Sequence, residues 1–476
     1  MQSTKKLTDQ ELIDKMGCFI KGYISKNTYD YPVVDYHSVN QLKEKIDFSL
    51  PDQFGDSKKI FESVELYLKY CVKTGHPQFF NQLWSGFNFP GFVGEVLTVL
   101  TNTSMYTYEV APVATLIEES LIQKFLTLIG FPETGGGTFV TGGSNGNLLA
   151  MLIARNKFLD LGNKIEDLCV FYSDKSHYSL DTAAMIVGIP KNNIIKVPTG
   201  ADHRINADVL DQKMKEVAQH GKVPFFVSAT AGTTVAGKFD PIFEIAHKVK
   251  KYKDCWLHVD GAHGGCILLS RQHKHLLKGI ELADSMVWDG HKVLGAPLIC
   301  SMFLLKEKEF LNFQGKSDGA KDYLFHSYEE SGSNLGTYSL QCGRRADCIK
   351  LWLMWNYYGT EGLEFRVNRL MDLARYAENK INFSDKLELA IKPEYVNVCF
   401  RYKLENADEK NDLFHNHLKE FLYKNGISMV NTASVNNKKC IRLVISNPDL
   451  QERDIDIFFE NILEAAEHIV NNTVAG

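Results

Sequence analysis

The middle of the chain, from about residue 138 to 305, alternates between two hydrophobic patterns. Short runs of apolar and β-branched residues are typical of buried strands. Between them lie stretches with helical periodicity, such as 206–219 and 240–251. This alternation predicts a mostly parallel sheet covered by helices. The predicted strands are 138–140, 168–172, 225–227, 256–259, 285–288 and 301–305.

Different patterns flank this region. The N-terminal part is helical and opens with Thr8 and Glu11, the spacing of a capping box. A helical stretch over 343–382 precedes a smaller α+β unit. We expect an N-terminal helical segment (1–75), a large domain (76–360) and a small C-terminal domain (361–476). The small unit should contain strands at 396–402, 427–430 and 440–446 and helices at 408–424 and 452–472.

Composition excludes several classes of protein. The 53 basic and 58 acidic residues give a net charge of −5, which argues against a nucleic-acid partner. The N-terminus lacks an apolar signal core, and no apolar stretch approaches the ~18 residues of a membrane span. The ten cysteines are scattered without a CxxC pair. Reduced, buried thiols and a cytoplasmic location are therefore expected.

Lys292 and Asp260 follow two neighbouring predicted strands. Lys292 lies in Asp-Gly-His-Lys after 285–288, and Asp260 ends the run that begins at Trp256. A lysine that forms a Schiff base and an aspartate that keeps a pyridine nitrogen protonated are what pyridoxal phosphate (PLP) chemistry needs. Because ligands of parallel sheets bind beyond the carboxyl ends of strands, this pair is a candidate PLP site.

A glycine-rich turn, 142–147, follows the first predicted strand and opens a helix at 148–158. Backbone N–H groups at such a helix start can bind phosphate. A tight strand–helix connection without a ligand explains the glycines about equally well. The turn is neither GxGxxG nor followed by a P-loop lysine, which weakens a nicotinamide or nucleotide interpretation.

Two more strand ends carry polar candidates. His177 follows the strand ending at Tyr172, where its imidazole could stack on a flat ring; a capping or solvent-facing histidine is the alternative. Thr234 follows 225–227 and could bond the phenolic oxygen of PLP, or lie in a polar turn. His273 and His275 lack carboxylate or thiolate partners at ligand spacing, so no metal site is expected. The order of strand-end groups along the chain is stronger evidence than any one of them.

With these motifs the chain resembles the group II PLP-dependent decarboxylases, and most of all their glutamate and cysteine sulfinate branch. The resemblance extends over about residues 60–470. It implies PLP fold type I, the aspartate-aminotransferase-like α/β fold. The matching strings are HPQFFNQL (76–83), NTSMYTYEVAPV (102–113), HVD (258–260), HK (291–292), QCGR (341–344), LWLMW (351–355) and RLVISNP (442–448).

The resemblance also implies roles for individual residues. Lys292 matches the Schiff-base lysine, Asp260 the pyridinium partner, and His177 the stacking histidine. Tyr323 matches a mobile-loop tyrosine that returns a proton to Cα. The expected cofactor-binding residues also include Gly143, Ser144, Asn145, Thr234 and His291. The expected substrate-binding residues are Gln82, Ser85, Ser104, Tyr106 and Arg442, some of which line the partner's pocket in a homodimer with shared active sites.

Departures from the family pattern bear on the substrate. Asp289-Gly290 replaces the usual Asn-Pro before His-Lys, and Gly261 replaces an alanine. The extra anion at Asp289 could alter the local field. Ser104, Tyr106 and the segment 84–86 resemble the cysteine sulfinate and aspartate branch more than the glutamate branch.

We therefore expect a PLP-dependent α-decarboxylase of an L-amino acid, with cysteine sulfinate, aspartate or glutamate as substrate. Other substrates, such as 2,4-diaminobutyrate or an aromatic amino acid, stay open. A PLP-dependent aldehyde synthase or an aminotransferase is a rival, but oxidative relatives tend to replace the loop tyrosine by phenylalanine. A non-catalytic PLP-binding homologue is the remaining alternative, and the presence of both Lys292 and Asp260 argues against it.

Overall fold

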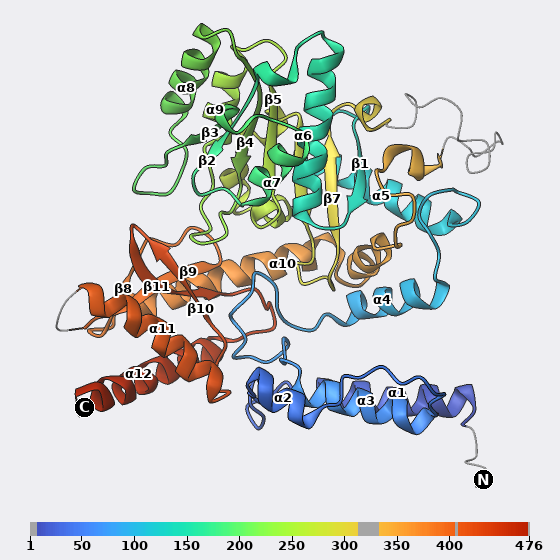
Figure 1. Cartoon of the computed structure of the whole chain (residues 1–476), viewed down its shortest axis with the longest axis vertical. Helices are drawn as coiled ribbons and strands as arrows, with labels where there is room; N and C mark the ends of the chain where they lie inside the picture. Colours follow the sequence, from blue (N-terminus) through green and yellow to red (C-terminus); the bar gives the residue numbers. More distant parts are fainter. Residues whose placement is uncertain (1–6, 313–332, 405–407, 475–476) are drawn as a thin grey trace. The chain divides into compact units, whose positions relative to one another are not determined.

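A computed structural model describes residues 7–312, 333–404 and 408–474 (Figure 1). The chain forms two compact units. The first unit comprises residues 1–87, 376–390 and 399–476, and the second comprises 88–375 and 391–398. Among the described helices, none is both long and apolar enough to cross a membrane.

The second unit contains a seven-stranded sheet in the order β1-β7-β6-β5-β4-β2-β3 (Figure 1). The neighbours β2–β3, β2–β4, β4–β5 and β5–β6 are parallel, whereas β7 is antiparallel to both β6 and β1. The mostly parallel sheet is thus confirmed. The strands are β1 (Gly136–Val140), β2 (Leu168–Ser173), β3 (Ile194–Val197), β4 (Val223–Thr230), β5 (Trp256–Gly261), β6 (Ser285–Asp289) and β7 (Ser301–Leu305).

The central strands of this sheet are mostly apolar, as expected for strands that helices cover. Every residue of β1, β2, β5, β6 and β7 is buried. Helix α6 packs on β4 to β7, and helices α8 and α9 pack on β4. The helices are α4 (Phe89–Thr101), α5 (Pro112–Ile129), α6 (Gly143–Asp160), α7 (Ser179–Ile186), α8 (Ala207–Gln219), α9 (Ile242–Val249) and α10 (Cys348–Asn382), the last of which reaches into the first unit.

Strand β3 was absent from the sequence-based prediction. It has only four residues, and three of them are partly or fully exposed, so it lacks the apolar run of the central strands. It lies at the end of the strand order, next to β2. An edge strand needs apolar residues on fewer of its positions, which explains why the pattern did not reveal it.

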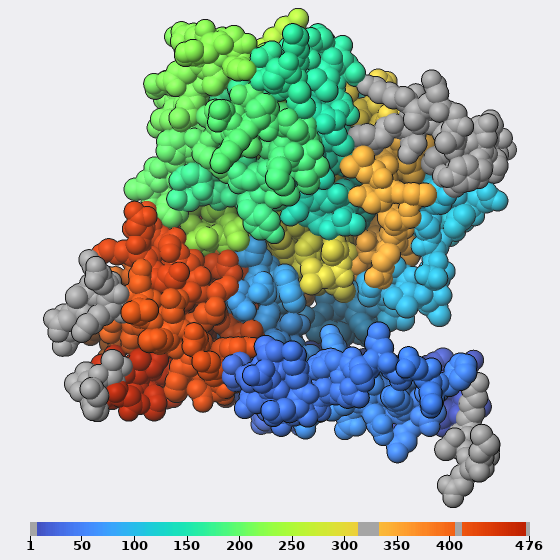
Figure 2. Space-filling view, in the orientation of Figure 1, coloured from blue at the N-terminus to red at the C-terminus, as the bar shows by residue number. Residues whose placement is uncertain are grey.

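The first unit holds the N-terminal helices α1 (Asp9–Ile24), α2 (Val39–Lys45) and α3 (Ser57–Tyr70). The predicted capping box is confirmed: the Glu11 backbone N–H donates to Thr8 Oγ1, and the Thr8 N–H donates to Glu11 Oε2. Neither α1 nor α2 has a buried residue. Figure 2 shows the surface of these helices in blue.

The C-terminal part of this unit is built around a four-stranded sheet in the order β10-β11-β9-β8. The predicted strand 427–430 is wrong. Met429 pairs instead with Phe79 in an isolated bridge, and the hairpin strand is Asn431–Val435. The elements are β8 (Leu387–Leu389), β9 (Asn397–Tyr402), β10 (Asn431–Val435), β11 (Lys438–Val444), α11 (Asp408–Lys424) and α12 (Glu452–Val474).

Candidate active site at the carboxyl edge of the sheet

The carboxyl ends of several strands meet at one edge of the seven-stranded sheet. Thr230 at the end of β4 lies opposite Asp260 of β5, and Asp260 lies opposite Val287 of β6. Because β7 is antiparallel to both β1 and β6, β1 runs in the direction of β6 and also ends at this edge. Side chains that follow these strands are therefore brought together although they are far apart in the sequence.

A cavity of about 310 Å³ lies at this edge, which is within the range of ligand sites, ~300–1,000 Å³. Its walls contain most of the predicted cofactor-binding residues, as well as several residues that were not among those predictions. The predicted residues are Gly143, Ser144, His177, Thr234, Asp260, His291 and Lys292; the others are Thr141, Gly142, Asn147, Tyr178, Thr230, Gly232, Ala262, His263 and Asp289.

Asp260 is buried, and both carboxylate oxygens accept hydrogen bonds. Oδ1 accepts from the backbone N–H of Ala262 at 3.2 Å, and Oδ2 accepts from Nδ2 of Asn147 at 2.9 Å. Donors to both oxygens fix the plane of the carboxylate. A carboxylate held in place is what a protonated ring nitrogen requires as its partner.

Lys292 lies three residues beyond the end of β6 and forms an ion pair with Asp289. Its Nζ atom is 3.2 Å from Asp289 Oδ2, and the Lys292 side chain is 20% exposed. Asp289 is buried, and Ser301 Oγ donates to its Oδ1 at 2.6 Å. The Lys292 amine therefore lies beside an anion, Asp289, at a position where the family pattern has an asparagine.

His177 lies in the loop after β2 and is partly buried. Its Nδ1 accepts from the backbone N–H of Ser179 at 3.3 Å, and Ser179 Oγ is 2.9 Å from the same atom. Burial lowers the pKa of His177; the Asp260 carboxylate opposes this shift, and the Lys292 ammonium adds to it. A neutral imidazole is therefore favoured.

The glycine-rich turn forms a cradle for an anion. Gly142 has φ +119°, and α6 starts at Gly143, so the N–H groups of Gly143 and Ser144 lie in a first helical turn without intrahelical acceptors. A Cβ at Gly143 would lie 2.8 Å from Ala262 Cβ and 3.0 Å from Asp289 Oδ2. Glycine thus keeps the cradle open, and Asp289 stands beside it.

Of the remaining predicted cofactor-binding residues, Thr234 and His291 line the cavity and Asn145 does not. Thr234 lines the cavity, and its carbonyl accepts from Asn397 Nδ2 at 3.0 Å. His291 is buried, its Nε2 lies 3.7 Å from Asp289 Oδ2, and burial lowers its pKa. Asn145 belongs to the same turn but lines a neighbouring cavity with Thr182.

The predicted substrate-binding residues are divided between the two units. In the first unit, Arg442 Nη2 donates to the Asn81 carbonyl at 2.9 Å, and Ser85 Oγ lies 2.8 Å from Ser446 Oγ. Gln82 is half-buried in the same segment as Ser85. In the second unit, Ser104 precedes Tyr106, whose carbonyl accepts from the Gly336 N–H at 2.9 Å. Tyr323 lies outside the described residues. These assignments stay predictions.

Sequence reasoning missed the polar groups that support the site. Asn147 contacts both Asp260 and Ser179, and His258 contacts Asn147. Asn147 was visible only as the last residue of the glycine-rich turn. A signal was present in the helical spacing, because Asn147 lies about one turn beyond Gly143, on the same face of α6.

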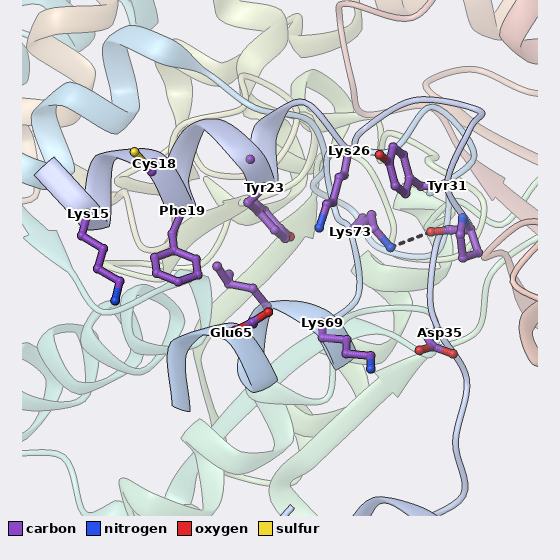
Figure 3. Close-up of a pocket in the computed structure, with 13 residues that line it drawn as sticks. Lys15, Cys18, Phe19, Tyr23, Lys26, Tyr31, Asp35, Glu65, Lys69 and Lys73 are labelled. Atoms are coloured by element: carbon purple, nitrogen blue, oxygen red, sulfur yellow. Dashed lines mark hydrogen bonds between the residues drawn. The ribbon is translucent and has the colours of Figure 1, made fainter. Parts of the chain in front are cut away.

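A larger cavity, of about 700 Å³, lies in the first unit between α1 and α3 (Figure 3). Its walls include Lys15, Lys26 and Lys69, together with Phe19 and Tyr23. It contains none of the strand-end groups on which the predicted chemistry depends. Among the described residues, no group of three or more His, Cys, Asp and Glu side chains is placed to hold a metal ion.

The residues of the strand-edge cavity fit PLP. The glycine cradle can take a phosphate, Asp260 can pair with a ring nitrogen, and Lys292 supplies an amine for the aldehyde. The one discordant group is Asp289, which places a second anion beside the phosphate cradle.

Three comparisons place the chain among known proteins. The pyridoxal-dependent decarboxylase conserved domain matches residues 40–403. Cysteine sulfinic acid decarboxylase from Rattus norvegicus is 37% identical over 464 residues, covering 94% of this chain and 93% of the rat protein. The crystal structure of mouse CSAD matches with a TM-score of 0.90 at 34% identity, covering 96% of this chain and 99% of that chain. The crystal structure of Oryza sativa TDC with PLP and tryptamine has a TM-score of 0.89 at 23% identity, covers 98% of this chain and 99% of that chain, and supports the fold alone.

Proposed function

This chain belongs to the family of pyridoxal-dependent decarboxylases, and we propose that its substrate is an acidic L-amino acid: cysteine sulfinate, aspartate or glutamate. Membership of the family confirms the reaction class, a PLP-dependent amino-acid carboxy-lyase, and the cofactor that the Lys292–Asp260 pair predicts. The type I fold expected from the sequence is confirmed as well.

Five residues of the cavity have a part in the proposed mechanism. Bound PLP supplies the electron sink that makes loss of CO₂ possible. The N–H groups of Gly143 and Ser144 would hold its phosphate, and Asp260 would hold a proton at the ring nitrogen. Lys292 would supply the amine for the cofactor aldehyde. His177 would help to orient the ring.

The proposal of an acidic substrate rests mainly on one observation, the 37% identity to a cysteine sulfinic acid decarboxylase over 94% of the chain. The buried Arg442 agrees with it. Burial lowers the pKa of this guanidinium, and Nη2 already donates to the Asn81 carbonyl. An arginine of this kind can bind a second acidic group of a substrate.

A screen of CO₂ release tests the proposed substrate. Purified holoenzyme is given cysteine sulfinate, aspartate, glutamate, 2,4-diaminobutyrate and aromatic amino acids, with Lys292→Ala as the blank. We expect the acidic substrates to have the highest kcat/KM. Faster turnover of 2,4-diaminobutyrate or an aromatic amino acid would overturn the acidic assignment. Aldehyde and peroxide in place of the amine would identify an aldehyde synthase.

We also propose that the chain acts as a homodimer. Helix α4 exposes Phe89, Val96, Val99 and Leu100, and the last of these is 75% exposed. Helix α5 begins with exposed apolar residues too, namely Val113 and Leu116. Apolar side chains grouped in this way on a water-soluble enzyme are typical of subunit interfaces.

Complementation tests whether the active sites are shared. Lys292→Ala and Tyr106→Ala protomers, each inactive alone, are unfolded and refolded together. If Tyr106 serves the partner's cavity, mixed dimers regain one intact site and activity returns. An active monomer in sedimentation, or no recovery in mixed dimers of confirmed composition, would contradict shared sites.

A cytoplasmic location is proposed from the thiols. All ten cysteines lie within the described residues, none of them forms a disulfide there, and most of them are buried. Reduced thiols in this number favour a reducing compartment. Fractionation of cells that express the tagged chain tests the location directly.

A further inference from the structure

A directed chain of hydrogen bonds runs beneath the cavity from Trp256 to Asp260. The indole Nε1–H of Trp256, which can only donate, lies 2.8 Å from Ser285 Oγ. Ser285 Oγ lies 2.9 Å from His258 Nδ1. Because the serine accepts from the indole, its own proton is directed to Nδ1. His258 is fully buried, and its pKa is lowered to about 4, mainly by burial, so it is neutral and carries its proton on Nε2.

At Asn147 this series of hydrogen bonds divides into two branches. Its Oδ1 accepts from His258 Nε2 at 2.9 Å. Its Nδ2 donates at 2.9 Å to Asp260 Oδ2 and at 2.9 Å to Ser179 Oγ. The opposite orientation of the amide would place Oδ1 against the Asp260 carboxylate and Nδ2 against the His258 N–H, so the network fixes the amide as described.

The second branch ends on His177. The backbone N–H of Ser179 cannot rotate and donates to His177 Nδ1 at 3.3 Å, so Nδ1 is an acceptor. Ser179 Oγ accepts from Asn147 and directs its proton to the same Nδ1 at 2.9 Å. The neutral His177 ring therefore carries its proton on Nε2.

We propose that Asn147 is a positioning residue that couples the two groups expected to contact the cofactor ring, Asp260 and His177. One amide fixes the carboxylate plane directly and the imidazole through Ser179. The hydrogen bonds that run from Trp256 through Ser285 and His258 fix the orientation of that amide. The inference rests on the cofactor site of the proposed function, but its readouts need no substrate, so a failed substrate screen leaves it testable.

Burial makes the hydrogen bonds of Asn147 costly to lose. Asn147 is 1% exposed and Ser179 is 3% exposed, so lost partners cannot be replaced freely by bulk water. A hydrogen bond to a buried charged group contributes ~1.5–3 kcal/mol, which corresponds to roughly 10- to 100-fold in an equilibrium constant. Cofactor affinity should therefore depend on Asn147, although the contacts with the ring are assigned to Asp260 and His177.

The test uses Asn147→Asp, which keeps the shape and the acceptor for His258 but replaces the donor to Asp260 and Ser179 by an oxygen. PLP is titrated into the apo-protein, and its dissociation constant and visible circular dichroism are measured. We expect the dissociation constant to rise roughly 10- to 100-fold and the dichroism of the bound cofactor to fall. Ser179→Ala, which breaks only the His177 branch, should lower the dichroism with a smaller change in affinity.

The matched control is Asn193→Asp. Asn193 is also buried, and its Nδ2 donates two hydrogen bonds, to the carbonyls of Glu166 and Leu168, outside the cavity. This variant should keep the affinity and dichroism of the wild type. Wild-type values for Asn147→Asp, or equal losses in the control, would overturn the proposal. If Asn147→Asp does not fold, Asn147→Ser is measured in its place, and unchanged affinity and dichroism would overturn it equally.

Discussion

The Nζ atom of Lys292 lies 3.2 Å from Oδ2 of Asp289, and the two side chains form an ion pair beyond the carboxyl end of β6. The same carboxylate oxygen lies 3.0 Å from the position of a Cβ on Gly143, in the phosphate cradle. With a cofactor in the cradle, Asp289 would face its phosphate. We therefore expect the carboxylate to oppose cofactor binding.

Asp289→Asn should bind PLP more tightly. The amide keeps the size of the side chain and removes the repulsion between the carboxylate and the phosphate, a gain on the order of 1 kcal/mol or roughly fivefold in affinity. Titration of the apo-protein with PLP measures this change. Weaker binding by the variant would contradict this expectation. It would show that the Asp289–Lys292 ion pair favours PLP binding by more than the carboxylate–phosphate repulsion opposes it.

Asp260→Asn should keep the fold and lose at least ~10²-fold in turnover, because a neutral amide cannot hold a proton at the ring nitrogen. Asp240→Asn is the matched control. Asp240 is also buried and accepts from the backbone N–H groups of Ile205 and Thr230, but it does not line the cavity. The account predicts lower stability but normal cofactor spectra for the control. Near-normal turnover of Asp260→Asn would assign the ring proton to another group.

His258 should make stability depend on pH between about 6.5 and about 4. Burial lowers its pKa to about 4 in the folded chain, whereas the unfolded chain takes up the proton near ~6.5. The neutral histidine therefore contributes stability above ~6.5 that is lost as the pH falls through this window, up to about 3 kcal/mol.

The measurement compares melting temperatures of the wild type and His258→Gln at several pH values. Asp240 acts in the opposite direction, since burial raises its pKa to about 6 and its contribution is lost as the pH rises. Both proteins contain Asp240, so the difference between them isolates His258. Parallel curves for the two proteins would reject the assignment.

Glu118→Gln should be strongly destabilising. Arg344 donates two hydrogen bonds to the Glu118 carboxylate, at 2.7 and 2.6 Å, and both side chains are buried. Removal of one charge leaves the other unpaired, which costs ~3–5 kcal/mol. Glu420→Gln, which breaks the exposed pair with Lys424, is the control and should change little. Similar unfolding midpoints for the two variants would contradict this account.

The sequence predicted the large sheet because its central strands are continuous apolar runs, and it predicted the site because polar groups follow those strands. Two features explain what it missed. The strand 431–435 alternates polar and apolar residues and follows a more apolar segment at Met429, whose backbone pairs with residues 78–80. The better signal was Asn436-Asn437, both at positive φ, as a two-residue hairpin turn requires.

The support for the site was harder to predict. His258 and Asn147 are 111 residues apart in the chain, and only the packing of α6 on the sheet brings their side chains to 2.9 Å. Strand-end position reveals groups that face a ligand. It does not reveal groups that orient them from below, because these lie within strands and helices whose pattern is otherwise apolar.

Reductive trapping tests the central claim most directly. The holoenzyme is treated with borohydride, digested, and mapped by mass spectrometry. The account predicts a single pyridoxyl label on the peptide that contains Lys292, and no label on that peptide in Lys292→Ala. A label on another lysine of the wild-type protein, or none at all, would contradict the assignment of Lys292 and of the strand-edge cavity as the cofactor site.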